Sequence, residues 1–548
     1  MADWNFADAW ETVAEVVPDA PALVHGERRV TWRELDRRAN AVAQALLEAG
    51  AKSQDKVAQY LYNCPEYMES VFAAMKAGLV PVNTNYRYTA DELVYLWDNA
   101  DVVAVVFHGS FSERIDGLRQ RVPRVQSWLW VDDGSGPCPP WALSYEEVAA
   151  PGAQQVTPPW GRSGDDLLLL YTGGTTGMPK GVMWRQDDLF RRLNAGNIIR
   201  VPEDEGTAGL RKTIVGPGPI AIPACPEMHG TGEFVAMGIM SVGGCIVTLT
   251  QRSFDPVELL ETVDRENVNV LAIVGDAFAK PILAAWDAEP KRFSLATLIA
   301  IISSGVMWSE ETKRGLLRHR PTLMLIDAFS SSEALGMGAS LSTGTDAEHT
   351  AHFTLGPDVR VIDPDTGADV VHGSGQRGVL ALAGRNPLGY YKDAEKTAAT
   401  FKELGGIRYS IPGDYAVVES DGSIQLLGRG SVVINTGGEK VFPEEVEEAL
   451  KLHPAVRDAV AVGVPNERFG EEVTAAVELR PGTTVTEAEL IDHVRARLAA
   501  YKAPRHIRFV DVLGRSPSGK LDYGRQRADM AQWLEQTGSP APTAPGRP

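Results

Sequence analysis

The chain has 548 residues, a formal net charge of −19, 44% hydrophobic residues and 23% charged residues. This length exceeds what one hydrophobic core supports, so two or more domains are expected, and the acidic balance without a long basic run argues against a nucleic-acid partner. The four cysteines are scattered, which indicates neither a disulfide framework nor a zinc site, and a reduced, cytoplasmic setting is expected. The sequence predicts neither a signal peptide nor a membrane span. Peripheral membrane contact and a homodimer are left open.

Strand and helix signals alternate up to residue 107. A strand is expected at 55–61, and a helix from Cys64 to Ala77 because Pro is favoured in the first turn of a helix. Thr89 and Glu92 have the spacing of a capping box that opens another helix. Residues 101–107 are almost wholly apolar, which is typical of a buried strand. The alternation predicts a parallel sheet covered by helices.

A Gly/Thr-rich segment, residues 171–181, follows an apolar strand at 167–170. Its four glycines allow backbone N–H groups to approach a ligand closely, and three threonines and Lys180 add hydroxyls and a positive charge. This combination suits a polyphosphate. The common nucleotide loop has Gly before its Lys and Ser or Thr after it, whereas Pro179 and Gly181 flank Lys180, so a P-loop kinase is excluded. Taken alone, the segment fits a flexible surface turn equally well.

The alternation resumes after this segment and changes character near residue 359. Further strands are expected at 245–250, 268–274, 297–303 and 322–326, with helices beginning at Asp255 and Ser309. From Val359 onward, short strands with Gly and Asp-Gly turns indicate a small β-rich subdomain. After Arg429 the pattern becomes α+β, with helices at 443–452 and 487–498. The proline-rich residues 534–548 are expected to be a disordered tail.

Two stretches in the middle of the chain carry side chains that could act in a site. His229 lies in a Pro-Glu-Met-His-Gly stretch, although a lone His is more often structural. Glu333 ends the stretch that begins at Asp327, directly after an apolar strand. A carboxylate at the C-terminal end of a parallel strand faces a ligand crevice and could hold Mg²⁺ through oxygen. The alternative for Glu333 is a helix N-terminus, where the dipole favours an acid.

Three more such stretches lie near the C-terminus. Asp414 precedes the pair Gly428-Arg429 and could bind ribose hydroxyls, although Asp is also common in plain turns. Residues 435–440 form a second Gly-rich turn, which ends in Lys440. Lys520 lies on a Gly/Ser/Pro loop, where a Lys is normally solvated.

Together these motifs resemble, in their order, the adenylate-forming superfamily of acyl-CoA synthetases, luciferases and peptide-synthetase adenylation domains. The resemblance covers about residues 5 to 530. The Gly/Thr-rich segment resembles the family's phosphate loop, and residues 329–333 stand where the family has Tyr-Gly-x-Thr-Glu. Five later stretches match the family's later motifs: 412–414, 428–429, 437–440, 501–504 and 517–520. Residues 181–186 and 385–391 resemble actinobacterial fatty-acyl and steroid side-chain CoA ligases.

The resemblance implies an α/β fold with a mobile C-terminal part. A large N-terminal adenylation domain (1–428) would contain several subdomains, with parallel sheets flanked by helices and a small β-rich subdomain. A hinge at 429–431 would join it to a small mobile α+β C-terminal domain (432–533). The implied function is an ATP-dependent acyl-CoA ligase: a carboxylate and ATP give acyl-AMP and pyrophosphate, and CoA then displaces AMP. The implied partners are a small-molecule carboxylic acid, ATP and CoA, with Mg²⁺ as cofactor.

The resemblance also implies roles for individual residues. Lys520 would offset charge in the first step, Glu333 would hold Mg²⁺, and His229 would lie between ATP and the acid. The implied ATP-binding residues are Thr172, Gly173, Gly174, Thr175, Thr176, Gly177, Lys180, Ser304, Gly305, Asp327, Ala328, Phe329, Ser332, Asp414, Arg429 and Lys520. The implied CoA-binding residues are Gly437, Gly438, Glu439 and Lys440, and Ser431 would be the hinge residue.

The acyl pocket is expected from segments 225–237, 275–278 and 303–307. Their neighbourhood is rich in small residues, which leave room for a fatty acid or a steroid side-chain acid: Gly230, Gly232, Gly238, Gly275 and Ala277. The alternatives are an acyl-AMP ligase that serves a carrier protein, an aryl or short-chain acid CoA ligase, a luciferase-like oxygenase and a non-catalytic ligand-binding homologue. The presence of Lys520 and Glu333 argues against the last of these.

Three departures from the family's motifs affect four positions. Ser431 stands where the hinge usually has Asp or Lys, Phe329 and Ser330 replace Tyr and Gly, and Pro412 replaces Thr. No departure removes a charged group that the chemistry needs, and a hinge requires only tolerance of a change in φ and ψ. The activity is therefore still expected.

Overall fold

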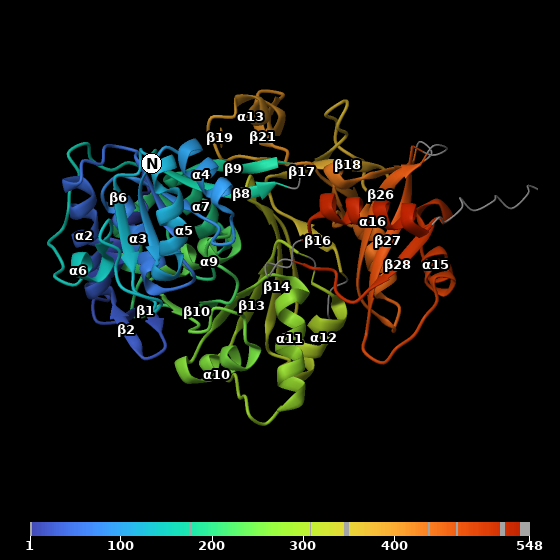
Figure 1. Cartoon of the computed structure of the whole chain (residues 1–548), viewed down its shortest axis with the longest axis horizontal. Coiled ribbons are helices and arrows are strands. Elements are labelled where there is room, and N and C mark those ends of the chain that lie inside the picture. Colours follow the sequence, from blue (N-terminus) through green and yellow to red (C-terminus); the bar gives the residue numbers. More distant parts are fainter. Residues whose placement is uncertain are drawn as a thin grey trace, which may run out of the picture. The chain divides into compact units, whose positions relative to one another are not determined.

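The computed structural model describes residues 3–174, 177–306, 308–344, 350–436, 439–466, 470–515 and 521–537. The chain forms two compact units: unit 1 consists of Met1–Arg360 and Ala381–Pro412, and unit 2 of Val361–Leu380 and Gly413–Pro548 (Figure 1). The expected domains divide the chain differently, because residues 361–380 and 413–428 belong to unit 2. The hinge at 429–431 stays a prediction.

The first sheet of unit 1 has the strand order β19-β9-β8-β4-β3-β5-β6-β7. Its strands are parallel from β8 to β7, and β9 is antiparallel to both of its neighbours, β8 and β19. The bounds are β3 (Lys56–Tyr60), β4 (Val80–Asn83), β5 (Val102–His108), β6 (Ser127–Val131), β7 (Leu143–Ser144), β8 (Leu167–Gly174), β9 (Gly177–Arg185) and β19 (Gly389–Tyr390).

The second sheet of unit 1 runs β2-β1-β11-β10-β12-β13-β14-β15-β16. It is parallel from β1 to β14 and antiparallel at both ends. The bounds are β1 (Pro21–His25), β2 (Arg28–Thr31), β10 (Ile220–Pro223), β11 (Cys245–Thr248), β12 (Val270–Ile273), β13 (Ala300–Ser304), β14 (Met324–Ser331), β15 (Ala334–Ser342) and β16 (His352–Leu355). A small antiparallel group is formed by β20 (Phe401–Leu404), β21 (Ile407–Ser410) and the end of β18 (Arg377–Ala383).

The cores show that the two sheets and their helices form five layers. Successive strand residues point to opposite faces, so Leu23 lies in the core between the sheets and Val24 in the core on the outer face. The layer between the sheets contains α1 (Phe6–Val16), α2 (Trp32–Glu48), α3 (Pro65–Lys76), α6 (Tyr145–Ala149), α7 (Gln186–Gly196), α8 (Gly206–Thr213) and α9 (Gly230–Met240). The second sheet is covered outside by α10 (Pro256–Glu266), α11 (Gly275–Ala288) and α12 (Glu310–His319), and the first by α4 (Ala90–Asn99) and α5 (Ser112–Leu118).

The local signals of the sequence lie where they were expected. Helix α3 begins at Pro65, and the capping box of α4 is complete: Glu92 donates its N–H to the Thr89 hydroxyl, and its carboxylate accepts from Thr89. The expected strand 322–326 continues to Ser331 as β14, because the antiparallel partner β15 pairs with its second half. The α/β fold is confirmed.

Unit 2 is built on a long hairpin of β26 (Val456–Asn466) and β27 (Gly470–Leu479), with β28 (His506–Val510) parallel to β27. Val460 and Val462 face α16 (Tyr523–Thr537), whereas Ala459 and Ala461 face α14 (Pro443–Lys451) and α15 (Glu487–Arg495). The other strands are β17 (Val359–Ile362), β22 (Asp414–Val418), β23 (Ile424–Arg429), β24 (Ile434–Thr436) and β25 (Glu439–Val441). Helix α16 covers residues 534–537 of the expected tail, and residues 538–548 lie outside the described residues.

Short helical elements complete the described chain: η1 (Gly109–Phe111), η2 (Arg119–Arg121), η3 (Glu203–Glu205), α13 (Ala394–Thr400), η4 (Gly430–Val432) and η5 (Ala500–Lys502). Among the residues that the structure describes, no helix has both the length and the apolar character needed to cross a membrane.

Candidate active site

The Gly/Thr-rich segment is the tip of the β8–β9 hairpin. Leu168, Leu169 and Leu170 are buried, which confirms the buried strand before it. Strand pairing continues further than the sequence indicated: Thr172 lies opposite Lys180, and Gly174 opposite Gly177. Thr175 and Thr176 lie outside the described residues.

Gly181 is required by the packing of this hairpin. A Cβ at Gly181 would come within 2.6 Å of the ring of Tyr171, which lies directly opposite on β8. The Tyr171 hydroxyl in turn donates to the side-chain oxygen of Asn99 at 2.6 Å. The base of the hairpin is therefore fixed against α4.

Lys180 forms an ion pair with Asp393. The Lys180 side chain is 40% exposed, so its ammonium is accessible to a ligand. The hydrogen bond from Lys180 is the largest influence on Asp393 and lowers the pKa of that carboxyl. Asp393 also caps α13, because it accepts a hydrogen bond from the Lys396 N–H at 2.9 Å.

Glu333 lies in the turn between β14 and β15, not at a helix N-terminus. Its side chain is 8% exposed, and its Oε1 accepts a 2.6 Å hydrogen bond from the Tyr390 hydroxyl. The hydroxyl of Ser410 donates to its backbone carbonyl at 2.7 Å. Ser332 is held as well, since the Trp184 indole donates to its carbonyl at 3.0 Å.

One five-residue stretch connects the two charged candidates. Residues 389–393 contain both Tyr390, the partner of Glu333, and Asp393, the partner of Lys180. The stretch is anchored on β9, where Tyr390 pairs with Val182 and the Tyr391 N–H donates to the Gly181 carbonyl at 2.8 Å. The fold therefore connects Lys180 and Glu333 through one short stretch of chain.

Several of the predicted ATP-binding residues meet at the carboxyl ends of β13 and β14. These strands are parallel, and Ser304 pairs with Ala328. Gly305 follows with a φ of +93°, a conformation that favours glycine. The ring of Phe329 contacts that of Phe353 in a tilted arrangement, with the ring centroids 5.5 Å apart. The carboxyl edge of a parallel sheet is where α/β folds bind ligands.

Sequence reasoning missed Lys313, the buried neighbour of Asp327. The Lys313 side chain on α12 is 1% exposed, and its Nζ lies 3.9 Å from Oδ2 of Asp327. Burial raises the pKa of Asp327 to about 7, and the Lys313 ammonium opposes that rise. A helical Lys with charged neighbours gives no local sign that it points into the core.

His229 occupies the N-cap position of α9 at the end of a tight turn after β10. Two glutamates of the same turn and helix, Glu227 and Glu233, are fully or almost fully buried. Desolvation raises the pKa of each carboxyl to about 8, and the neighbouring Glu233 adds to the rise for Glu227. No ion pair to Lys or Arg supports either of them among the described residues.

The three segments predicted for the acyl pocket approach one another at Gly305. A Cβ built there would lie 3.9 Å from the Thr231 hydroxyl and 3.9 Å from the Val274 side chain. Thr231 belongs to the segment 225–237, and Val274 immediately precedes 275–278. Met307 lies outside the described residues.

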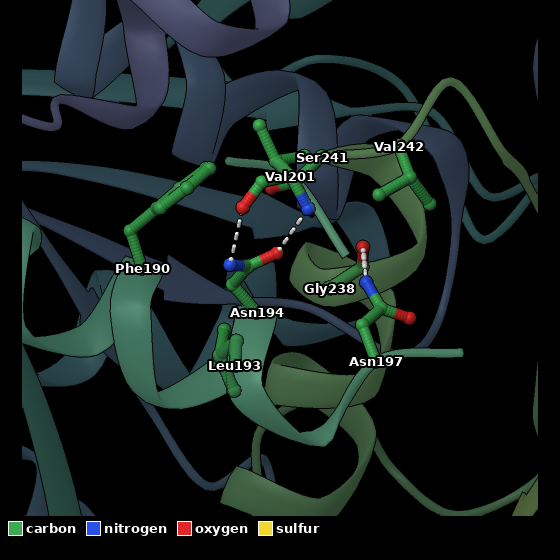
Figure 2. A pocket seen from close by; sticks show the side chains of 8 residues that line it. All are labelled: Phe190, Leu193, Asn194, Asn197, Val201, Gly238, Ser241 and Val242. Carbon is green, nitrogen blue, oxygen red and sulfur yellow. Dashed lines mark hydrogen bonds between the residues drawn. The ribbon is translucent and has the colours of Figure 1, made fainter. Parts of the chain in front are cut away.

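A separate small pocket lies between α7 and α9 (Figure 2). Eight residues line it: Phe190, Leu193, Asn194, Asn197, Val201, Gly238, Ser241 and Val242. It has a cavity volume of about 0 Å³, so it has no room for a small molecule, whose sites have about 300–1,000 Å³. Asn194 bonds both backbone groups of Val201, and Asn197 donates to the Gly238 carbonyl, so the polar side chains here secure a loop.

Unit 2 brings Asp414 and Arg429 directly opposite each other in the β22–β23 hairpin. Asp414 is 6% exposed. Gly413 has a φ of +97°, and its carbonyl accepts a hydrogen bond from the Gly430 N–H at 2.9 Å, which closes the hairpin. The ribose-binding role of Asp414 and Arg429 stays a prediction.

The remaining predicted residues fall on parts of the chain that the structure describes only in part. Glu439 and Lys440 belong to β25, opposite Thr436 and Asn435. Gly437, Gly438 and Lys520 lie outside the described residues. Their roles stay predictions.

The fold and the match to a known family together define the class of the protein. The chain belongs to the AMP-binding enzyme family, whose model matches residues 10–391, and the AMP-binding enzyme C-terminal domain matches residues 445–520. Among the relatives, the medium/long-chain-fatty-acid–CoA/3-oxocholest-4-en-26-oate–CoA ligase of Mycolicibacterium smegmatis is 42% identical over 528 residues, or 95% of each chain. The 3-oxocholest-4-en-26-oate–CoA ligase of Rhodococcus rhodochrous is 41% identical over 95% of this chain and 94% of its own.

Solved structures show the same fold. The anthranilate CoA ligase AuaEII, in complex with anthranoyl-AMP, superposes with a TM-score of 0.83 over 97% of this chain and 98% of its own, at 22% identity. At that identity the likeness concerns the fold alone.

Proposed function

We propose that the protein is an ATP-dependent acyl-CoA ligase whose substrate is a bulky hydrophobic carboxylic acid, either a fatty acid or a steroid side-chain acid. The observation that carries the proposal is the 42% identity, over 95% of both chains, to a ligase named for these two kinds of acid. The contacts of Lys180 with Asp393 and of Glu333 with Tyr390, on one short stretch of chain, support it.

The first half-reaction joins the acid to the nucleotide. A carboxylate oxygen attacks the α-phosphorus of ATP, the bond to the β-phosphate breaks, and pyrophosphate leaves. Lys180 and the N–H groups of the Gly/Thr-rich segment bind the polyphosphate, and Lys520 offsets the negative charge that develops at the α-phosphate. His229 separates the nucleotide from the acid.

The second half-reaction transfers the acyl group to CoA. The thiol loses its proton, its sulfur attacks the acyl carbon, and the bond to AMP breaks. Gly437, Gly438, Glu439 and Lys440 are assigned to the CoA channel, and the C-terminal part turns at Ser431 between the two steps. Asp414 and Arg429 hold the ribose.

Glu333 fits a magnesium ligand. Mg²⁺ is commonly held by one or two carboxylates together with substrate phosphates. Tyr390 fixes Oε1 of Glu333, and the second carboxylate oxygen would bind the ion. When bound, the ion neutralises phosphate charge. We also propose that the protein is cytoplasmic.

Hydroxylamine trapping with ATP and a panel of acids tests the function. We expect hydroxamate and pyrophosphate with fatty or steroid side-chain acids, and an acyl-CoA product when CoA is added. Hydroxamate without any CoA thioester would instead indicate a carrier-protein acceptor. The absence of hydroxamate with fatty, steroid and aryl acids alike would contradict the proposal.

The Lys520→Ala variant tests whether Lys520 acts in the first half-reaction and not in the second. Its rate of acid-dependent pyrophosphate release should fall about a hundredfold or more, which is the usual effect of removing one group that stabilises charge in the transition state. It should still form thioester from supplied acyl-AMP. An equal loss in both assays would reject the assignment of Lys520.

A further inference from the structure

Asn83, the last residue of β4, joins two parts of the candidate active site. Its side chain is 3% exposed. The amide oxygen accepts a hydrogen bond from the Tyr171 N–H at 2.6 Å, and the amide nitrogen donates to the carbonyls of Tyr171 at 2.9 Å and Met228 at 2.6 Å. Tyr171 begins the Gly/Thr-rich segment, and Met228 immediately precedes His229. One buried side chain therefore bonds both parts.

The same two parts are also in close van der Waals contact. A Cβ at Gly230, the first residue of α9, would lie 3.1 Å from the Leu170 side chain on β8. A Cβ at Gly232 would lie 2.7 Å from the Pro226 carbonyl, so the turn is packed tightly onto its helix. Since protein interiors are close-packed, a shift of β8 displaces the turn that carries His229.

The bonds of Asn83 make that link hard to break. The Tyr171 and Met228 carbonyls are buried acceptors, and leaving a buried acceptor without a donor is unfavourable. If the turn moved away from β8, the Met228 carbonyl would lose the hydrogen bond that the Asn83 amide donates to it. The two segments are thus favoured to move as one.

On the basis of the proposed ligase function, we propose that Asn83 is a positioning residue that couples the Gly/Thr-rich segment to His229, so that binding of the ATP polyphosphate and seating of the carboxylic acid depend on each other.

Asn63 provides a matched control in the same region. Its amide oxygen also accepts one hydrogen bond, from the Glu227 N–H at 2.8 Å, and its nitrogen also donates two, to the carbonyls of Pro223 at 3.1 Å and Cys225 at 3.0 Å. All of its partners lie on the His229 side, and none is on β8. Asn63 therefore supports the turn without linking it to the Gly/Thr-rich segment.

Asn83→Asp and Asn63→Asp each keep the size and the accepting oxygen of the side chain but remove two donated hydrogen bonds. In a pyrophosphate-release assay with dodecanoate as the acid, we expect Asn83→Asp to raise the KM for ATP and the KM for dodecanoate at least tenfold each. We expect Asn63→Asp to raise the KM for dodecanoate and to leave the KM for ATP within twofold of wild type. Equal effects of the two variants on the KM for ATP would overturn the proposal.

A pH profile separates coupling from general damage. At low pH the carboxyl introduced by Asn83→Asp is protonated and regains one donor, so its deficit in ATP binding should shrink relative to wild type. A deficit that is the same at every pH between 5.5 and 8 would indicate loss of structure instead, and would count against the role of Asn83.

Hydrogen exchange of the wild-type protein tests the coupling without turnover and without a variant. In the wild type, adding a Mg²⁺ complex of adenosine 5′-(α,β-methylene)triphosphate should slow exchange both at residues 167–174 and at residues 226–233. In Asn83→Asp, the same ligand should slow exchange at residues 167–174 only. If exchange at 226–233 in the wild type does not respond, the coupling is wrong. A different result would contradict the proposed ligase function itself: the wild type would then release no pyrophosphate with any acid.

Discussion

The hydroxyl of Tyr390 donates a 2.6 Å hydrogen bond to Oε1 of Glu333, and both side chains are more than nine-tenths buried. The bond fixes one carboxylate oxygen and so determines the direction in which the other points. Tyr390 itself is held by β9 and by Thr397, whose hydroxyl accepts from the Tyr390 N–H at 2.9 Å. The orientation of the proposed magnesium ligand is thus set from outside its own loop.

Tyr390→Phe should weaken the use of magnesium. Hydrogen bonds to charged groups contribute about 1.5–3 kcal/mol, and loss of part of this orientation should raise the Mg²⁺ concentration for half-maximal pyrophosphate release about threefold to tenfold. Titration of Mg²⁺ at a fixed ATP concentration measures the change.

Tyr391→Phe is the matched control for this prediction. The Tyr391 hydroxyl donates to Oδ2 of Asp101 at 2.8 Å, away from Glu333. Its removal should leave the magnesium dependence unchanged. If both variants shift the titration alike, Tyr390 has no specific effect on Glu333.

The local pattern predicted the elements on which the candidate residues lie. The capping box at Thr89 is a short-range signal, and the meeting of Ser304 with Ala328 follows from two parallel strands that end at one edge. Asp414 and Arg429 lie opposite each other because a tight turn between them fixes the register. Such features require only neighbouring segments.

The supporting contacts could not be predicted in this way. Tyr390 and Glu333 are hydrogen-bonded but lie 57 residues apart in the sequence, and Asn83 and Met228 lie 145 residues apart. Nothing in the local pattern distinguishes a hydroxyl or amide that bonds a site residue from one that faces water. Lys313 is a further case, because its burial results from the packing of α12 and not from its neighbours in sequence.

Asp393→Asn should strengthen ATP binding. Asn caps a helix about as well as Asp, so α13 should keep its N-cap while the negative charge opposite Lys180 is lost. Exposed ion pairs contribute about 0.2–1 kcal/mol, and the release of Lys180 for the polyphosphate should lower the KM for ATP up to about fivefold. Steady-state kinetics with varied ATP measure this.

A double-mutant comparison controls this second prediction. In the Lys180→Met background, Asp393→Asn should have no effect on the KM for ATP, because the cation it would release is absent. A higher KM for ATP in Asp393→Asn alone would mean that the carboxylate positions Lys180 productively rather than competing with phosphate.

Lys313→Met should destabilise unit 1. The change removes the cation 3.9 Å from the buried Asp327, and breaking one side of a buried ion pair typically costs about 3–5 kcal/mol. The pKa of Asp327 should rise above its present value of about 7. Urea unfolding at pH 8 measures the loss of stability, because Asp327 of the wild type is then mostly ionised and requires the cation.

Lys280→Met is the control for that loss. Lys280 pairs with Asp276 on the adjacent helix α11 at 3.1 Å, but its side chain is 40% exposed. Its removal should cost less than about 1 kcal/mol, as for exposed pairs. Similar losses for Lys313→Met and Lys280→Met would show that Lys313 contributes no buried charge compensation.

Glu227→Gln should change the pH dependence of stability. Burial of the carboxyl and the nearby Glu233 raise the pKa of Glu227 in the folded protein to about 8, from an ordinary value of 4.5. The folded protein therefore binds more protons than the unfolded chain between these pH values, and its stability falls as the pH rises through this window. Glutamine does not titrate, so the variant should gain about 2 kcal/mol relative to wild type between pH 5 and pH 7. Urea unfolding at both pH values measures this gain.

Glu66→Gln provides the opposite case. Glu66 is also buried, but the Arg28 guanidinium overcomes the desolvation and lowers the pKa of its carboxyl below 4.5. Glu66 is therefore ionised in the folded and the unfolded chain throughout pH 5 to 7, and its replacement should cost the same stability at both pH values. If Glu227→Gln shows the same flat difference as Glu66→Gln, Glu227 is ionised in the folded protein and has a cationic partner.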